Sequence, residues 1–405
     1  MRGIRDQVSG GRGWRVCRWS IVGRVFLVIP AVAVLVGCGG NGAAPTAKPA
    51  VTLAVQAPSV RASQTPAPLL TPDAPNTSDS SAPLSGISTT AAALPKFVQL
   101  TSGGCCVQPF FSPDDTQALF IDKSSPDATT GIYGVPLSQP LSTPTLFTPL
   151  LGPFSRDMSL AVDLIGGKTT LQKRTGDAPP WVINNGGRVI SFSPDNTLIA
   201  WNVSQDSGNF DVRRSEVWIA NLDGSAARRV LVRYGGGIQG WMDDSQRFLV
   251  GGKANRNDPT TTLSIFDLRD NSLRDVYSAD RMRGFNLSPD GNWLVFFIAQ
   301  SRQSDMNGMY LLDLKTPNAQ PKRQDWFGAY RWRNNTQLLY VPLISGAPSS
   351  ELRQLNIETG ATEVLLPASA DSPFKIGNGD WDTSRDGRHL LFVSARDRNI
   401  WLLNL

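Results

Sequence analysis

The chain has 405 residues, of which 39 are lysine or arginine, 34 are aspartate or glutamate and one is histidine, so its formal charge is +5 at pH 7. A single histidine and four cysteines that form no cluster supply few ligands for a zinc site, and we expect neither a metal nor a cofactor. Composition changes sharply along the chain, so its segments are considered separately, starting from the N-terminus.

Residues 1–37 have the features of a secretory signal peptide. The first 24 residues carry six arginines and one aspartate, and the stretch VFLVIPAVAVLV follows from Val25 to Val36. This apolar stretch is shorter than the about 20 residues that a membrane-spanning helix needs. A retained membrane anchor is therefore the less favoured interpretation.

The end of the apolar stretch, Leu35-Val36-Gly37-Cys38, resembles the lipobox of bacterial lipoproteins. The resemblance implies that Cys38 carries a diacylglycerol and becomes the new N-terminus. Two acyl chains suffice for stable anchoring where one does not. We therefore expect a chain anchored to the membrane through the lipid on Cys38, with its folded part extracytoplasmic, in the periplasm or on the cell surface.

Cleavage before Cys38 changes the charge of the protein. Six of the 39 basic residues and one of the 34 acidic residues lie in 1–37, which leaves 33 of each sign. A neutral mature chain lacks the one-signed field that nucleic-acid binding requires. We expect no nucleic acid among its partners.

Residues 38–95 are rich in alanine, proline, serine and threonine. Between 39 and 95 the only charged residues are Lys48, Arg61, Asp73 and Asp79, and the apolar residues show no stable period. Such a segment buries too little apolar surface to offset the entropy of ordering it. We expect a disordered tether between the membrane and a folded domain over 96–405.

A short motif recurs seven times in 96–405, at spacings of 38 to 51 residues. Serine and aspartate can accept backbone hydrogen bonds in a turn, proline fixes φ, and glycine or asparagine tolerates positive φ. The apolar residues after each turn favour a strand. The seven copies are FSPDDTQALFID from 111, FSRDMSLAVDLI from 154, FSPDNTLIAWNV from 192, WMDDSQRFLVGG from 241, LSPDGNWLVFFI from 287, WRNNTQLLYVPL from 332 and TSRDGRHLLFVS from 383.

A third predicted strand follows every copy, and a fourth follows most of them, as at 227–232 and 362–367. Four short strands with a period of about 40 to 50 residues are typical of a propeller blade. The sequence predicts an all-β, seven-bladed β-propeller, with six blades as the alternative because the second repeat is short. The last repeat ends after its third strand, and we expect 95–101 to pair with 399–405 and close the ring.

The SPDG turn, the apolar strand after it and the later xxDLxxG pattern resemble the propeller repeat of the TolB C-terminal domain and its relatives. The resemblance covers 96–405 and implies a propeller of the cell envelope, often a platform for protein interaction. The separate α/β domain of TolB is not expected here.

Candidate catalytic residues are few. The motif aspartates, such as Asp114, Asp195 and Asp290, recur in equivalent positions, so they are expected to cap turns rather than to catalyse. No G-x-S-x-G motif is present, and His389 lies in an apolar strand, where we expect a structural role near Asp386.

Polar residues precede the motif in three successive repeats, where they are candidates to line the mouth of the central channel. They are Asn286, Arg331 and Asp382. An arginine beside two potential ligands suits a polar clamp better than a calcium cage, and ordinary hydrogen bonding between blades is the simpler interpretation of all three residues. A lactonase-like site remains the alternative.

Cys105 and Cys106 are adjacent in a chain with an export signal. Neighbouring Cα atoms are about 3.8 Å apart, below the usual disulfide span of about 4.4 to 6.8 Å. Either a rigid vicinal disulfide or two free thiols fits this pattern, and we favour the disulfide.

The longest and most varied connections are expected on one face, which is where a rigid scaffold usually carries recognition. The basic residues of these connections are a candidate binding patch, although scattered, solvated charge is the favoured interpretation. They are Arg213, Arg214, Lys253, Arg256, Arg302, Arg396 and Arg398.

The sequence as a whole predicts a lipoprotein whose propeller is a non-catalytic platform for a protein or a cell-envelope polymer. The alternative is an enzyme or sensor that binds a small molecule at the channel mouth.

Overall fold

The computed structural model of the chain describes residues 97–405 except 124, 126 and 205–207. The predicted signal peptide over 1–37, the predicted lipidation site Cys38 and the predicted tether over 38–95 lie outside the described residues. Within the described part of the chain, no helix is long and apolar enough to cross a membrane.

The described residues form antiparallel β-sheets and two single-turn 3-10 helices, η1 (Phe210–Val212) and η2 (Ser304–Met306). Each repeat of the sequence supplies one sheet unit, called a blade below, whose first strand is innermost. Blade 1 contains β2 (Val107–Phe111), β3 (Gln117–Asp122), β4 (Gly131–Pro136) and β5 (Thr145–Thr148). Blade 2 contains β6 (Leu160–Ile165), β7 (Lys168–Lys173) and β8 (Trp181–Ile183). A single bridge between Phe154 and Ala161 stands in place of its innermost strand.

Blades 3 and 4 share a strand. Blade 3 contains β9 (Ile190–Phe192), β10 (Leu198–Ser204), β11 (Arg214–Asn221) and the first half of β12 (Arg228–Trp241). Blade 4 contains the second half of β12, β13 (Arg247–Lys253), β14 (Thr261–Asp267) and β15 (Leu273–Ala279). The register of β12 against β13 shifts between Tyr234 and Gly237. Gly235 has φ +65°, and a Cβ there would lie 2.6 Å from the carbonyl oxygen of Asp211, so only glycine fits at this bend.

The last three blades complete the domain. Blade 5 contains β16 (Met282–Leu287), β17 (Trp293–Ile298), β18 (Gly308–Asp313) and β19 (Lys322–Arg323). Blade 6 contains β20 (Gly328–Trp332), β21 (Gln337–Pro342), β22 (Leu352–Asn356) and β23 (Thr362–Leu366). Blade 7 contains β24 (Ile376–Thr383), β25 (His389–Ser394), β26 (Ile400–Asn404) and β1 (Phe97–Gln99).

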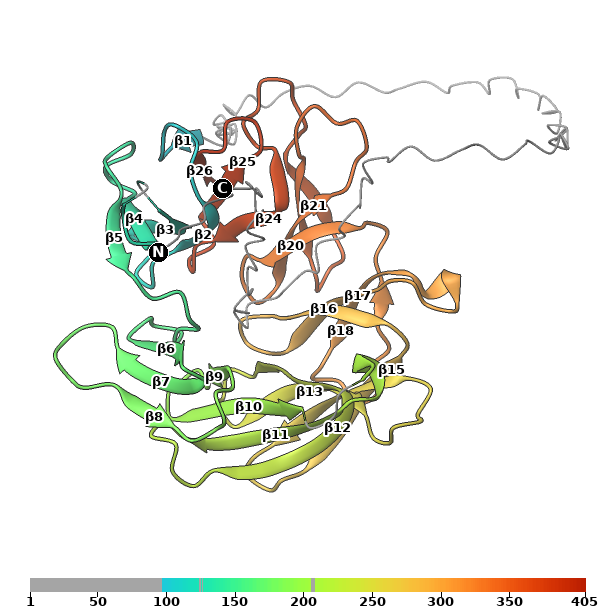
Figure 1. Cartoon of the computed structure of the whole chain (residues 1–405). Helices are drawn as coiled ribbons and strands as arrows, with labels where there is room; N and C mark the ends of the chain where they lie inside the picture. The colour runs from blue at the N-terminus through green and yellow to red at the C-terminus, as the bar shows by residue number, and fades with distance from the viewer. Residues whose placement is uncertain (1–96, 124, 126, 205–207) are drawn as a thin grey trace, which may run out of the picture. The chain divides into compact units, whose positions relative to one another are not determined.

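The pairing of β1 with β26 joins the two ends of the described chain, seen as adjacent blue and red strands in Figure 1. The registered partners are Phe97 with Leu403, Val98 with Leu402 and Gln99 with Trp401. The predicted pairing of 95–101 with the C-terminal strand is therefore confirmed for the described residues. It leaves β26 with a partner on both sides.

Apolar side chains fill the spaces between successive blades. The described residues form seven buried clusters, and each cluster joins one blade to the next. The cluster that closes the ring packs Leu100 and Leu402 of the blade 7 end against Phe111 and Phe120 of blade 1. The all-β propeller fold is confirmed, and seven interfaces favour seven blades over six, even though hydrogen bonding merges blades 3 and 4 into one sheet.

The recurring motif forms the turn between the first and second strands of a blade. In five copies the serine hydroxyl donates to the aspartate carboxylate over 2.5–2.6 Å. The same hydroxyl accepts a backbone N–H from five residues further on, over 2.9–3.0 Å. The aspartates therefore cap turns, as predicted. The five pairs are Ser112–Asp114, Ser155–Asp157, Ser193–Asp195, Ser288–Asp290 and Ser384–Asp386.

These caps predict a loss of stability in acid. Burial raises the pKa of Asp157, but hydrogen bonds from Ser155, Ser159 and Asn196 outweigh it and lower the pKa to about 2. Because the folded-state pKa lies below the ordinary 3.8, the stabilisation is present above about pH 4 and lost as the pH falls towards 2. We expect Asp157→Asn to lose less free energy of unfolding than the unchanged chain between about pH 5 and pH 2, measured by urea denaturation. Asp177→Asn is the control for the removal of one charge. Equal losses of free energy of unfolding in Asp157→Asn and in the unchanged chain would contradict a stabilising role for the Asp157 cap.

Candidate functional site

The motif turns converge on one face of the ring, called the turn face. Arg156 of blade 2 pairs with Asp243 of blade 4 over 2.7 Å, although blade 3 lies between them in the chain. Arg385 of blade 7 donates its backbone N–H to Asp115 of blade 1 and its guanidinium to the carbonyl of Arg156. These contacts between blades tie the turn face together. The opposite face, called the loop face, carries the longer connections.

Arg331 occupies the innermost strand of blade 6 and reaches blade 7. Its guanidinium donates to the carbonyls of Tyr330 and Gly379 over 3.0 and 3.3 Å, and lies 5.4 Å from the ring centroid of Trp381. Burial lowers the pKa of Arg331, while the negative charges of Asp382 and Asp380 oppose that shift. The arginine is therefore a clamp between two blades, held by backbone carbonyls and an aromatic ring.

The structure brings two of the three predicted channel residues together. Arg331 and Asp382 lie on neighbouring inner strands and interact electrostatically. Asn286 is joined to blade 6 through its backbone, since the indole of Trp332 donates to its carbonyl over 3.2 Å. The described part of the chain contains no group of three or more His, Cys, Asp or Glu side chains placed to hold a metal.

Asp380 is a further member of this polar group that the sequence reasoning missed. Burial raises the pKa of Asp380, and a hydrogen bond from the backbone of Gln108 and the charge of Arg331 oppose the rise. Asp380 precedes Asp382 by two residues on β24. Side chains two residues apart lie on the same side of a strand. The spacing of Asp380 and Asp382 was therefore the signal in the sequence that could have identified Asp380.

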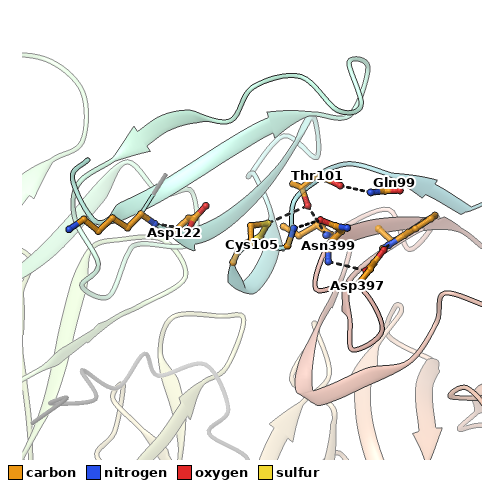
Figure 2. The surroundings of a disulfide bond; sticks show 11 residues. Gln99, Thr101, Cys105, Asp122, Asp397 and Asn399 are labelled. Carbon is orange, nitrogen blue, oxygen red and sulfur yellow. Dashed lines mark hydrogen bonds between the residues drawn. A yellow bond between two sulfur atoms is a disulfide. The ribbon is translucent and has the colours of Figure 1, made fainter. Parts of the chain in front are cut away.

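Cys105 and Cys106 form a disulfide in the connection between β1 and β2 (Figure 2). The loop is fastened to blade 7: Gly104 donates its N–H to the side chain of Asn399, and Cys105 donates to the carbonyl of Arg398, both over 3.0 Å. The hydroxyl of Thr101 lies 3.3 Å from the sulfur of Cys105 and accepts the N–H of residue 400. The disulfide therefore stands beside the ring closure.

The predicted basic residues do not form one patch. Arg214 and Lys253 both lie opposite Tyr234 in the strand register, and Arg256 lies 5.9 Å from the ring of Tyr234. Arg213, next in the chain to Arg214, donates to the carbonyl of residue 208 over 2.8 Å. These four residues gather where blades 3 and 4 share β12.

Arg214 is also engaged in an ion pair. It donates to Glu216 over 2.5 Å, and Arg229 donates to the same oxygen over 3.0 Å. Burial raises the pKa of Glu216, but hydrogen bonds from Arg214, Trp218 and Arg229 outweigh it and lower the pKa. Part of the positive charge near Tyr234 is therefore neutralised.

The other three predicted basic residues lie on different connections. Arg302 is exposed in the loop between β17 and β18. Arg396 donates to the carbonyls of Ala370 and Pro348, which ties the loop after β25 to the neighbouring blade. The backbone N–H of Arg398 donates to residue 394, and its φ is +58°. Arg396 therefore has a structural role, because it connects two neighbouring blades.

A groove with a volume of about 680 Å³ lies on the loop face between blades 5 and 6. It is formed by the ends of β17 and β18, by β19 and by the connection from β19 to β20. The groove is wide and open to solvent rather than an enclosed cavity. Its polar lining consists of Gln300, Asn307, Arg323, Gln324 and Asp325.

Aromatic and apolar side chains lie in and beside this groove. Trp326 is 9% exposed and Phe327 is 49% exposed, and both line it. Leu343 and Ile344, 80% and 47% exposed, follow β21, and the N–H of Leu343 donates to the carbonyl of Phe327 over 2.8 Å. We call Phe327, Leu343 and Ile344 the apolar rim. Sequence reasoning missed it, because Leu343 and Ile344 read as the end of an apolar strand.

Comparison with protein-family models gives no match, and comparison with curated proteins gives none either. Among solved structures, the chain is similar to an oligogalacturonate lyase in complex with manganese, with 14% identity, a TM-score of 0.50, and coverage of 77% of this chain and 96% of that one. Oligogalacturonate lyase from Vibrio parahaemolyticus gives 10% identity, a TM-score of 0.45, and coverage of 77% and 97%. TolB from Acinetobacter baumannii gives 16% identity, a TM-score of 0.36, and coverage of 68% and 76%. At such identities the likeness to the first lyase shows a shared fold alone.

Proposed function

We propose that the chain is a lipid-anchored protein of the cell envelope whose propeller binds a protein or a cell-envelope polymer through its loop face and performs no catalysis. The apolar rim is the observation that carries this proposal. Three exposed apolar side chains from two connections stand together beside a groove, and exposed apolar patches on folded proteins mark interaction surfaces.

The difference between the two faces supports binding at the loop face. The turn face is built from short, similar turns that bond to one another, as in the contact of Arg385 with Asp115. Varied connections on a rigid scaffold are where binding residues concentrate. The groove, the apolar rim and the cations near Tyr234 are therefore all accessible to a ligand that binds the loop face.

The anchor is proposed from the sequence around Cys38, and its test is chemical. Cys38→Ser removes the thiol that the lipid would occupy, so we expect no incorporation of labelled fatty acid and loss of the chain from the detergent-rich phase of Triton X-114. Cys17→Ser is the matched control, because it removes a cysteine upstream of the proposed cleavage site. Labelled Cys38→Ser protein, or a chain that stays membrane-bound without labelling, would contradict lipid anchoring.

Binding at the apolar rim is tested by capture of partners after cross-linking in intact cells that express the full chain. We expect Leu343→Asp to reduce the recovery of a cross-linked partner about tenfold or more, because a charge would replace a central apolar contact. Leu141→Asp is the control, since Leu141 is 57% exposed and lies between β4 and β5 of blade 1, away from the groove and the apolar rim. Equal recovery with Leu343→Asp and with the unchanged chain, or no partner in either, would contradict the proposal.

A small-molecule enzyme or sensor at the channel mouth is the second candidate. It is favoured by Asp380 and Asp382 beside Arg331, and by the fold shared with a lyase whose structure contains manganese. A cation beside two carboxylates competes with a metal for them, so we rank this candidate second. Manganese that raised the melting temperature of the unchanged chain, but not that of Asp382→Asn, would favour it.

A further inference from the structure

The groove between blades 5 and 6 is lined in part by side-chain amides that are each held by a hydrogen bond to the protein and that have a further donor or acceptor group available. Asn307 accepts the N–H of Ser301 at its amide oxygen over 3.0 Å, which leaves its NH2 group available. Gln324 donates its NH2 group to the carbonyl of Lys322 over 2.9 Å, which leaves its amide oxygen available. The groove therefore offers a held donor and a held acceptor.

Two charged side chains of opposite sign complete the polar lining. Arg323 donates to the backbone carbonyl of Asn307 over 2.9 Å, so its guanidinium spans from β19 towards the start of β18. Asp325 and Gln300 are exposed, and neither side chain has a hydrogen bond to another described residue. One cation and one anion give the lining no net charge, which favours an uncharged ligand over a polyanion.

The apolar part of the lining is rigidly supported. Trp326 stacks on Tyr340 with ring centroids 4.3 Å apart, and meets Tyr330 edge-on at 6.2 Å. Phe327 meets Phe297 edge-on at 5.9 Å and presents its other side to solvent. The indole N–H of Trp326 is buried and has no hydrogen-bond partner among the described residues, a feature that calls for an explanation in a folded protein.

A peptide added as an extra strand fits the groove poorly. The outer strand there, β19, has only two residues, Lys322 and Arg323, paired with β18. So short an edge offers few backbone groups for strand addition. The aromatic floor and the amide groups suit a ring that is apolar on its faces and hydroxylated at its rim, because a hydroxyl both donates and accepts.

We propose that this groove binds a neutral saccharide segment of a cell-envelope glycan, with the carbon face of a sugar ring against Phe327 and its hydroxyls on Asn307, Gln324 and Asp325. This proposal rests on the proposed function and deepens it by naming the chemistry of one ligand. It concerns binding alone, and no bond of the glycan is broken.

The test uses the full chain purified in detergent and an array of neutral oligosaccharides, with uronic-acid oligosaccharides as the charged comparison. The best neutral binder is then titrated against variants by calorimetry. We expect Phe327→Ala to weaken the affinity about tenfold, the size of one lost ring contact, and Asp325→Ala to weaken it by a similar factor. Phe210→Ala is the matched control, because Phe210 is an exposed aromatic residue of blade 3, outside the groove.

Each outcome decides the saccharide proposal. Neutral binding that falls in Phe327→Ala and persists in Phe210→Ala supports it, provided that both variants keep the melting temperature of the unchanged chain. Binding of uronic-acid oligosaccharides alone, binding that Phe327→Ala leaves unchanged, or no array binding overturns it. If the array fails while Leu343→Asp still loses a cross-linked protein, the proposed function stands and only its saccharide ligand is wrong.

Discussion

The hydrogen-bonded pairing of β1 with β26 is the constraint on which the rest of the propeller depends. Without β1, blade 7 would end at an open strand, and the cluster that contains Leu100 and Phe111 would lose Val98, which packs against it. Each blade buries its faces against two neighbours, so a ring that opens at one interface exposes apolar surface on both sides of the gap. The fastening of Gly104 and Cys105 to blade 7 lies next to this pairing and reinforces it.

Closure also accounts for the contrast between the two faces. Turns stabilised by their own serine and aspartate can be short, and short turns can meet across the ring, as those of Arg385 and Arg156 do. The connections on the loop face do not have to be short or to meet one another, so they can differ from blade to blade. The rim and the groove are such differences, found where blades 5 and 6 meet. A fixed ring therefore presents its variable groups in fixed positions.

The features predictable from the sequence are those that depend on residues close together in the chain. The Ser–Asp caps act within five residues, so a repeated motif reveals them, and a missing last strand points to 95–101 as its replacement. The continuous β12 depends on bends at glycines such as Gly235, which the motif spacing does not report. The groove brings Asn307 and Arg323 of blade 5 together with Trp326 and Phe327 of the connection to blade 6, and no local pattern encodes that arrangement.

Hydrogen–deuterium exchange of the β26 amides tests the closure most directly. In the unchanged chain the account predicts slow exchange over Ile400–Asn404, and faster exchange there and in β2 of blade 1 when Val98→Pro removes a backbone donor from β1. Thr145→Pro, on the outer strand of blade 1, should leave β26 protected. Rapid exchange of β26 in the unchanged chain, or protection that survives Val98→Pro, would contradict a ring closed by its two ends.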